Sequence, residues 1–147
     1  MYKRQGTRLW PKCKIHQAKQ FIDFGNWTLL GKTLERTKAS IFDAPVISTN
    51  KKYLKQIKQH LRKYKINNYK IVLEPAKRNT APAILSTALI KDIPDNQPLM
   101  FFSADHLIEK MSIFNKAINK NKLNLNEENI FVFGIKPKSP TLSLIHI

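Results

Sequence analysis

Apolar residues gather in four short, continuous runs along the chain, at residues 45–48, 69–73, 99–103 and 130–135. The runs are rich in β-branched and aromatic side chains and do not alternate with polar residues. Continuous runs of this length are typical of strands that are covered on both faces of a parallel sheet. The pattern therefore predicts four strands in a mostly parallel sheet.

Segments with helical spacing of apolar residues separate these runs. Residues 51–64 carry a regular apolar stripe, and Asn50 before them is a favourable N-cap. In residues 80–91, Pro82 falls in the first turn, where its missing N–H costs little. The other two helices are expected at residues 33–40 and 112–120. Strands that alternate with helices predict an α/β fold in which helices flank the sheet.

The charge of the chain is strongly positive. Its 147 residues accommodate one domain or part of a larger one, and the formal net charge of +16 first suggests nucleic acid. However, the chain has 21 lysines and only 5 arginines, and Asn and Ile are also frequent. Lys, Asn and Ile have A/T-rich codons, so a low-GC genome produces this composition without selection for a ligand. The densest basic stretch, residues 51–70, coincides with a predicted amphipathic helix. We therefore interpret the charge as compositional and expect no nucleic-acid partner.

Membrane and disulfide chemistry are not expected. No apolar run approaches the roughly 18–20 residues that a membrane helix needs. The single cysteine, Cys13, excludes an intrachain disulfide and suits a reducing cytosol. No Cys/His set has zinc spacing. We expect a cytoplasmic protein, and the sequence leaves its oligomeric state open.

Both ends of the chain match an inverted repeat at the DNA level. Residues 2–5 can be encoded by TAT AAG AGA CAG, whose reverse complement encodes Leu-Ser-Leu-Ile, the sequence of residues 142–145. A transposase-type sequencing adapter read in frame gives such a pair. We therefore expect residues 1–5 and 142–147 to be adapter sequence and residues 6–141 to be a partial domain, truncated at both ends and inactive by itself.

Gly6, Thr7 and Arg8 form the first candidate site. A glycine lets the backbone approach a phosphate closely, and an arginine offers a planar fork that fits phosphate oxygens. Taken alone, so short a motif is also typical of a surface turn with a solvated arginine.

Further sequence blocks give this motif a context. They are Gly-Thr-Arg-Leu-Trp-Pro at residues 6–11, Ala-Lys-Gln-Phe at 18–21, Val-Ile-Ser-Thr-Asn at 46–50, Leu-Glu-Pro-Ala-Lys-Arg-Asn-Thr-Ala-Pro-Ala at 73–83, Ser-Ala-Asp-His at 103–106 and Phe-Gly-Ile-Lys-Pro at 133–137. In this order, the blocks resemble the nucleotidyltransferase domain of the mannose-1-phosphate guanylyltransferase family, in the long bacterial type that is often fused to a mannose-6-phosphate isomerase. Ala18 and Ser103 stand where the family has proline.

The resemblance implies a Rossmann-like nucleotidyltransferase fold and a reaction. GTP and α-D-mannose 1-phosphate would give GDP-mannose and pyrophosphate, with Mg²⁺ as cofactor. The nucleophile is a phosphate oxygen that is already anionic, so the site needs alignment and positive charge rather than a general base. The family's sugar-binding residues and second metal-binding aspartate would lie beyond residue 141.

The resemblance also implies roles for individual residues. Arg8 and Lys19 would be catalytic, although a lysine among so many is otherwise an ordinary exposed side chain. The nucleotide would be bound by Gly6, Thr7, Arg8, Glu74, Arg78, Asn79 and Thr80. The last four could select guanine, while Asn79 or Thr80 could equally cap the helix that follows.

Asp105 is the candidate metal ligand. It follows the predicted strand at residues 99–103, and ligands gather at the carboxyl ends of strands in open α/β sheets. A carboxylate there can hold Mg²⁺, which keeps waters and phosphates as its other ligands. The alternative is a loop or capping aspartate. His106 would orient Asp105 or pack against its surroundings.

Two other interpretations stay open. One is a sugar-1-phosphate nucleotidyltransferase for another base or sugar, which a comparison of GTP with dTTP would separate. The other is a basic nucleotide- or nucleic-acid-binding module without catalysis, including a truncated paralogue that regulates a partner enzyme. Nucleic-acid binding would show a steep dependence on salt and no preference for GTP with Mg²⁺.

Overall fold

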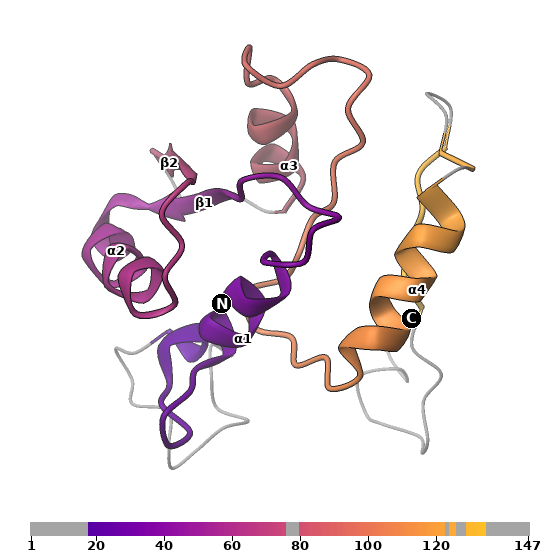
Figure 1. The fold of residues 1–147 in the computed structure, drawn as a ribbon. Coiled ribbons are helices and arrows are strands. Elements are labelled where there is room, and N and C mark those ends of the chain that lie inside the picture. Colours follow the sequence, from indigo (N-terminus) through magenta and orange to yellow (C-terminus); the bar gives the residue numbers. More distant parts are fainter. Residues whose placement is uncertain (1–17, 76–79, 123, 126–128, 135–147) are drawn as a thin grey trace, which may run out of the picture.

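The computed structural model describes residues 18–75, 80–122, 124–125 and 129–134 (Figure 1). Short helices and strands alternate along most of these ranges. In chain order the elements are η2 (Lys19–Phe21), α1 (Leu29–Arg36), β1 (Val46–Asn50), η3 (Lys51–Tyr53), α2 (Leu54–Lys63), β2 (Lys70–Glu74), α3 (Thr80–Ala88) and α4 (Met111–Lys122). No helix within the described ranges has the length and apolar character needed to cross a membrane.

The sheet of the described chain consists of β1 and β2. The two strands are parallel, with Val46 opposite Lys70 and Asn50 opposite Glu74. They are joined through η3 and α2, so this part of the chain is one strand–helix–strand unit. The α/β character and the parallel pairing predicted from the apolar runs at residues 45–48 and 69–73 are confirmed.

The other two predicted strands do not form within the residues that the structure describes. Residues 99–103 and the described part of 130–135 have no strand assignment and join neither edge of the sheet. Ile130 and Val132 are 93% and 86% exposed, and Phe101 is 45% exposed. A strand is stable only where a neighbour accepts and donates its backbone hydrogen bonds. The apolar runs indicated a need for burial, but the described chain supplies no pairing partner for them.

The helix predicted at residues 51–64 is confirmed, with a short 3₁₀ turn, η3, before α2. Asn50 caps its start, because the side-chain Oδ1 accepts a hydrogen bond from the N–H of Lys52 at 3.1 Å. Ile57 and Leu61 are 4% and 0% exposed. The lysines of this segment are exposed, as expected for the solvated face of a packed helix.

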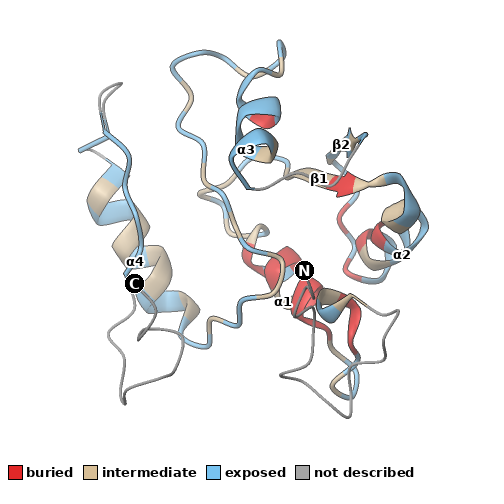
Figure 2. Cartoon of the chain, turned by 180° about the vertical axis from the view of Figure 1, so that it is seen from behind, coloured by how far each residue is buried: buried red, intermediate tan, exposed pale blue. Residues whose placement is uncertain are grey.

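The core lies between α1, α2 and the sheet (Figure 2). Its side chains come from η2, α1, α2 and the turn after α2, and Ile47 and Ile71 of the two strands pack against it. The buried members are Phe21, Leu30, Leu34, Ile57, Leu61, Tyr64 and Ile66. This cluster places η2 and α1 beside the strand–helix–strand unit.

Helix α1 begins four residues before the predicted 33–40. Thr28 ends an extended stretch, and its Oγ1 accepts the N–H of Gly31 at 2.9 Å, which defines an N-cap. The helix packs so closely on α2 that a Cβ at Gly31 would overlap the phenol ring of Tyr64. The Tyr64 hydroxyl is buried there without a hydrogen-bond partner.

Helices α3 and α4 lie outside this core. Helix α3 is three residues shorter than predicted at its carboxyl end, and only Thr87 is buried. Helix α4 has no buried residue, and its main packing is aromatic: the Phe114 ring lies 6.0 Å from that of Phe102 and 5.3 Å from that of Phe133. Phe102 in turn contacts Phe42 at 5.5 Å.

Candidate functional site

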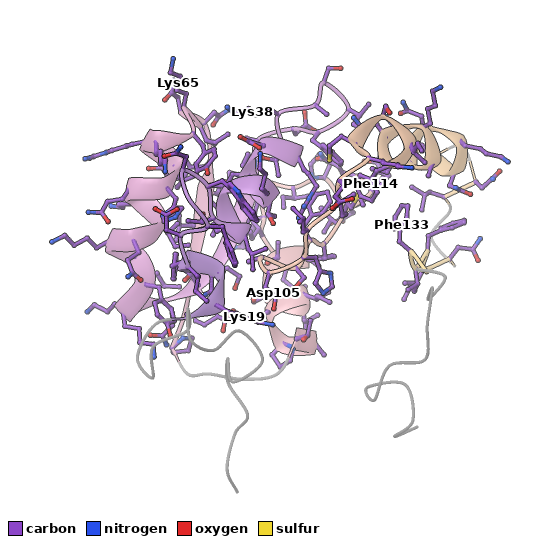
Figure 3. All side chains as sticks on the ribbon, turned by 90° about the horizontal axis from the view of Figure 1, so that it is seen from below. Lys19, Lys38, Lys65, Asp105, Phe114 and Phe133 are labelled. Carbon is purple, nitrogen blue, oxygen red and sulfur yellow. The ribbon has the colours of Figure 1, made fainter. Side chains whose placement is uncertain are left out.

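Lys19 and Asp105, which are far apart in sequence, form an ion pair between Lys19 Nζ and Asp105 Oδ2 (Figure 3). The Lys19 side chain is half exposed, whereas only 17% of the Asp105 side chain is exposed. Ser103 Oγ donates a hydrogen bond to the other carboxylate oxygen, Oδ1. His106 is largely exposed, and its Nε2 lies 3.9 Å from the same oxygen. The fold thus joins the residue predicted to meet phosphates with the residue predicted to hold the metal.

Lys19 is fixed through the short helix η2. The N–H of Phe21 donates to the carbonyl oxygen of Ala18 at 3.0 Å, which closes the turn. The Phe21 side chain is 6% exposed, and its ring lies 5.5 Å from that of Tyr53 and 5.4 Å from that of His60. Burying Phe21 anchors the turn in the core and leaves the ammonium of Lys19 at its surface.

The turn that carries Asp105 is held from α1. Arg36 Nη1 donates to the carbonyl oxygen of His106 at 3.0 Å, and Nη2 donates to Thr33 Oγ1 at 2.6 Å. Thr33 Oγ1 also lies 3.4 Å from the carbonyl oxygen of Ser103. Burial lowers the pKa of the Arg36 guanidinium from its ordinary value. Sequence reasoning missed Thr33 and Arg36, because only the buried environment distinguishes them from ordinary polar residues of an exposed helix face.

Glu74 and Thr80 lie elsewhere in the described chain. Glu74 ends β2, and its Oε1 accepts a hydrogen bond from Ser48 Oγ of β1 at 2.6 Å. Asn50 Nδ2 lies 3.5 Å from the carbonyl oxygen of Glu74. Thr80 is the first residue of α3. Within the described ranges, no hydrogen bond or ion pair joins Glu74 or Thr80 to the pair of Lys19 and Asp105.

The remaining predicted site residues lie outside the described ranges. They are Gly6, Thr7, Arg8, Arg78 and Asn79. Their roles in binding the triphosphate and the base therefore stay predictions.

A single carboxylate such as that of Asp105 is a donor that Mg²⁺ can use. No group of three or more His, Cys, Asp or Glu side chains comes together in the described part of the chain. Zinc would need such a set, whereas Mg²⁺ commonly uses one or two carboxylates and completes its shell with waters and substrate phosphates. The ammonium of Lys19 contacts Asp105 Oδ2, so Lys19 would lie beside a metal ion held by this carboxylate.

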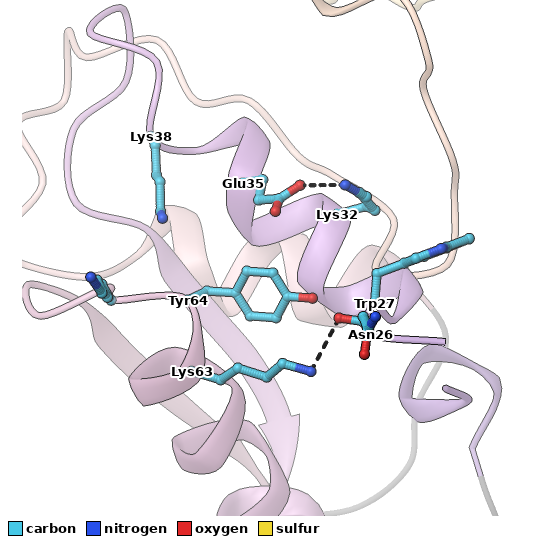
Figure 4. Close-up of a pocket in the computed structure, with 8 residues that line it drawn as sticks. Asn26, Trp27, Lys32, Glu35, Lys38, Lys63 and Tyr64 are labelled. Atoms are coloured by element: carbon cyan, nitrogen blue, oxygen red, sulfur yellow. Dashed lines mark hydrogen bonds and ion pairs between the residues drawn. The ribbon is translucent and has the colours of Figure 1, made fainter. Parts of the chain in front are cut away.

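A separate depression of about 480 Å³ lies between α1 and the end of α2 (Figure 4). On its α1 side, Lys32 Nζ pairs with Glu35 Oε2 at 2.9 Å. On its α2 side, Lys63 Nζ donates to the carbonyl oxygen of Asn26 at 3.2 Å. The lining residues are Asn26, Trp27, Lys32, Glu35, Lys38, Lys63, Tyr64 and Lys65. None of the predicted site residues belongs to this depression.

Comparison with known proteins covers nearly the whole chain. The sequence profile of the nucleotidyl transferase family matches residues 5–143. Mannose-1-phosphate guanylyltransferase 2 of Escherichia coli O157:H7 is 38% identical over 137 residues, which are 90% of this chain and 28% of that protein. The mannose-1-phosphate guanylyltransferase of Klebsiella pneumoniae is 34% identical over 92% of this chain and 29% of its own length.

A third relative, mannose-1-phosphate guanylyltransferase of Sinorhizobium fredii, is 32% identical over 92% of this chain and 27% of its own length. The chain therefore spans less than a third of each of these relatives. No solved structure matches it. The profile match includes Lys19 and Asp105 together with the strand–helix–strand unit, and it leaves out only a few residues at either end. The chain belongs to the nucleotidyl transferase family.

Proposed function

We propose that this protein transfers a guanylyl group from GTP to α-D-mannose 1-phosphate. A phosphate oxygen of the sugar phosphate forms a bond to the α-phosphorus of GTP, and the bond from that phosphorus to the β-phosphate oxygen breaks. The products are GDP-mannose and pyrophosphate. The observation that carries the proposal is the contact of Lys19 with Asp105, within a chain whose relatives are named mannose-1-phosphate guanylyltransferases.

Charge and alignment are what the reaction requires from the protein. The attacking oxygen is already anionic, so no general base has to remove a proton. Lys19 supplies one positive charge for the substrate phosphates from a turn that is anchored in the core. Gly6, Thr7 and Arg8 would hold the triphosphate. Glu74, Arg78, Asn79 and Thr80 would contribute to the nucleotide side.

Asp105 is the described residue that would hold Mg²⁺. The metal supplies charge neutralisation at the phosphates when bound. Asp105 would hold the metal, and the ammonium of Lys19 beside it would contact a phosphate oxygen of the substrate. Before substrate binds, the ion pair holds both side chains at the site. It also neutralises the charge of each by the other. A cytoplasmic location is part of the same proposal.

The decisive test is turnover by the complete reading frame that contains this chain, expressed from the source DNA. Pyrophosphate release should require GTP, mannose 1-phosphate and Mg²⁺ together. In parallel assays, dTTP replaces GTP and glucose 1-phosphate replaces mannose 1-phosphate, and each replacement should lower turnover. Asp105→Asn and Lys19→Gln should each lower kcat by about a hundredfold, the loss typical when one preorganised charge contact is removed. Lys32→Gln, in the separate depression, is the matched control and should turn over normally.

Three outcomes would contradict the proposal in different ways. Faster turnover with dTTP or with another sugar phosphate would show a nucleotidyltransferase with a different substrate from the one proposed. Normal turnover in Asp105→Asn would remove that carboxylate from the metal site. Absence of turnover in the complete protein under all substrate pairs, with nucleotide binding retained, would favour a non-catalytic nucleotide-binding member of the family.

A further inference from the structure

Arg36 is the one charged residue that is buried in the described part of the chain. It is 2% exposed, its two terminal nitrogens donate hydrogen bonds, and its Cζ lies 5.6 Å from the ring centroid of Phe102. None of the ion pairs between described residues includes it. Burying a guanidinium without a carboxylate partner is costly. An apolar side chain would pack here at a lower cost, so packing alone does not account for Arg36.

The hydrogen bonds of Arg36 and Thr33 reach both ends of one short segment. Arg36 donates to the carbonyl oxygen of His106. The Thr33 hydroxyl lies 3.4 Å from the carbonyl oxygen of Ser103 and 3.1 Å from that of Leu29, between which its one proton is shared. The two side chains are also joined to each other at 2.6 Å. They therefore contact the backbone on each side of Asp105, and both come from one rigid element, α1.

We propose that Arg36 is a positioning residue for Asp105, an inference that rests on the proposed function. Together with Thr33, it fixes the turn at residues 103–106 against α1 so that the carboxylate faces Lys19. Arg36 does not touch substrate in this role. It acts on catalysis by reducing the freedom of the metal ligand before substrate binds, which is how supporting shells of metal sites work.

The test compares three substitutions in the complete reading frame. Arg36→Met keeps most of the side-chain volume and removes every donor. Arg36→Lys keeps the charge and one donor to the His106 carbonyl. Arg62→Met makes the same chemical change at an exposed arginine of α2 and is the matched control. Denaturant unfolding of each variant establishes that it folds.

Two readouts separate positioning from packing. The first is the Mg²⁺ concentration at half-maximal turnover, which should rise about tenfold in Arg36→Met, less in Arg36→Lys and not at all in Arg62→Met. The second, which needs no activity, is amide hydrogen exchange of the peptide that contains residues 103–106. Its exchange should be faster in Arg36→Met and should return toward the wild-type rate in Arg36→Lys.

A purely structural role predicts the opposite order. Methionine suits a buried site better than lysine. Arg36→Met would then need no more Mg²⁺ for half-maximal turnover than Arg36→Lys, and its residues 103–106 would exchange no faster. That result overturns the inference. If the wild-type protein shows no Mg²⁺-dependent turnover, the proposed function fails, and the exchange experiment alone still decides whether Arg36 fixes the turn.

Discussion

Replacing Gly31 by alanine should destabilise the chain, although the same change in most helices is stabilising. Gly31 lies inside α1, where alanine normally gains about 1 kcal/mol over glycine from helix propensity. Here the added Cβ would overlap the hydroxyl oxygen, Cζ and Cε2 of Tyr64. The phenol ring is rigid and 8% exposed, so it cannot move aside without disturbing the core.

The magnitude follows from these opposing terms. Overpacking a well-filled core costs about 1–3 kcal/mol, and expelling the ring altogether costs about 3–5 kcal/mol, as for a large-to-small change. Subtracting the gain in helix propensity leaves a net loss of up to about 2 kcal/mol if the ring shifts. For a chain of this length, each kcal/mol lowers Tm by about 2–4 °C.

Urea unfolding of the 147-residue chain, followed by far-UV circular dichroism, measures this loss. The matched background is Tyr64→Leu, which removes all three atoms that the Cβ would meet. In that background, Gly31→Ala should stabilise the chain by about 1 kcal/mol, because only the propensity term remains. The reasoning is refuted if Gly31→Ala stabilises the chain with Tyr64 in place, or if its effect is the same in both backgrounds.

Three further predictions concern stability and are measured by the same unfolding assay. Leu61→Ala should cost about 3 kcal/mol, since its side chain is fully buried; a loss below 1 kcal/mol would contradict its place in the core. Thr28→Ala should cost about 1 kcal/mol through loss of the cap on Gly31 N–H, and an unchanged midpoint would refute the cap. The hydrogen bond and charge of Lys70 hold the pKa of the exposed Asp92 below its ordinary value, so any stability from this pair is present above that value and disappears as pH falls through the folded-state pKa. Asp92→Asn should therefore lower the urea midpoint slightly at neutral pH and leave it unchanged at pH 2. A larger loss at pH 2 than at neutral pH would contradict the lowered pKa of Asp92.

The parts of the fold that the sequence predicted are those determined by local interactions. The strand–helix–strand unit from β1 to β2 carries its own signals, including the Asn50 cap and the apolar stripe that reaches Leu61. Residues 99–103 carry the same apolar signal as β1. They are not a strand, because pairing depends on a neighbour that a local pattern does not specify.

The candidate site was predictable only in part, for the same reason. The resemblance to a family identified Lys19 and Asp105 separately, and the structure shows that they meet. Nothing in the sequence marks Arg36, since an arginine in the last turn of a helix is ordinarily solvated and favourable there. Its burial arises from Phe102 and the turn at residues 103–106, which approach α1 from about 70 residues further along the chain.

The aromatic packing of α4 has a consequence for how the protein opens. Helix α4 contributes no buried residue, and it contacts Phe102 through the ring of Phe114. Few buried contacts mean a small free energy of local opening, so α4 should exchange its amides and admit protease before α1 or α2 does. The turn of Asp105 is bound to α1 rather than to α4. Detachment of α4 would therefore leave the ion pair with Lys19 in place, and the chain would open in two stages rather than in one cooperative event.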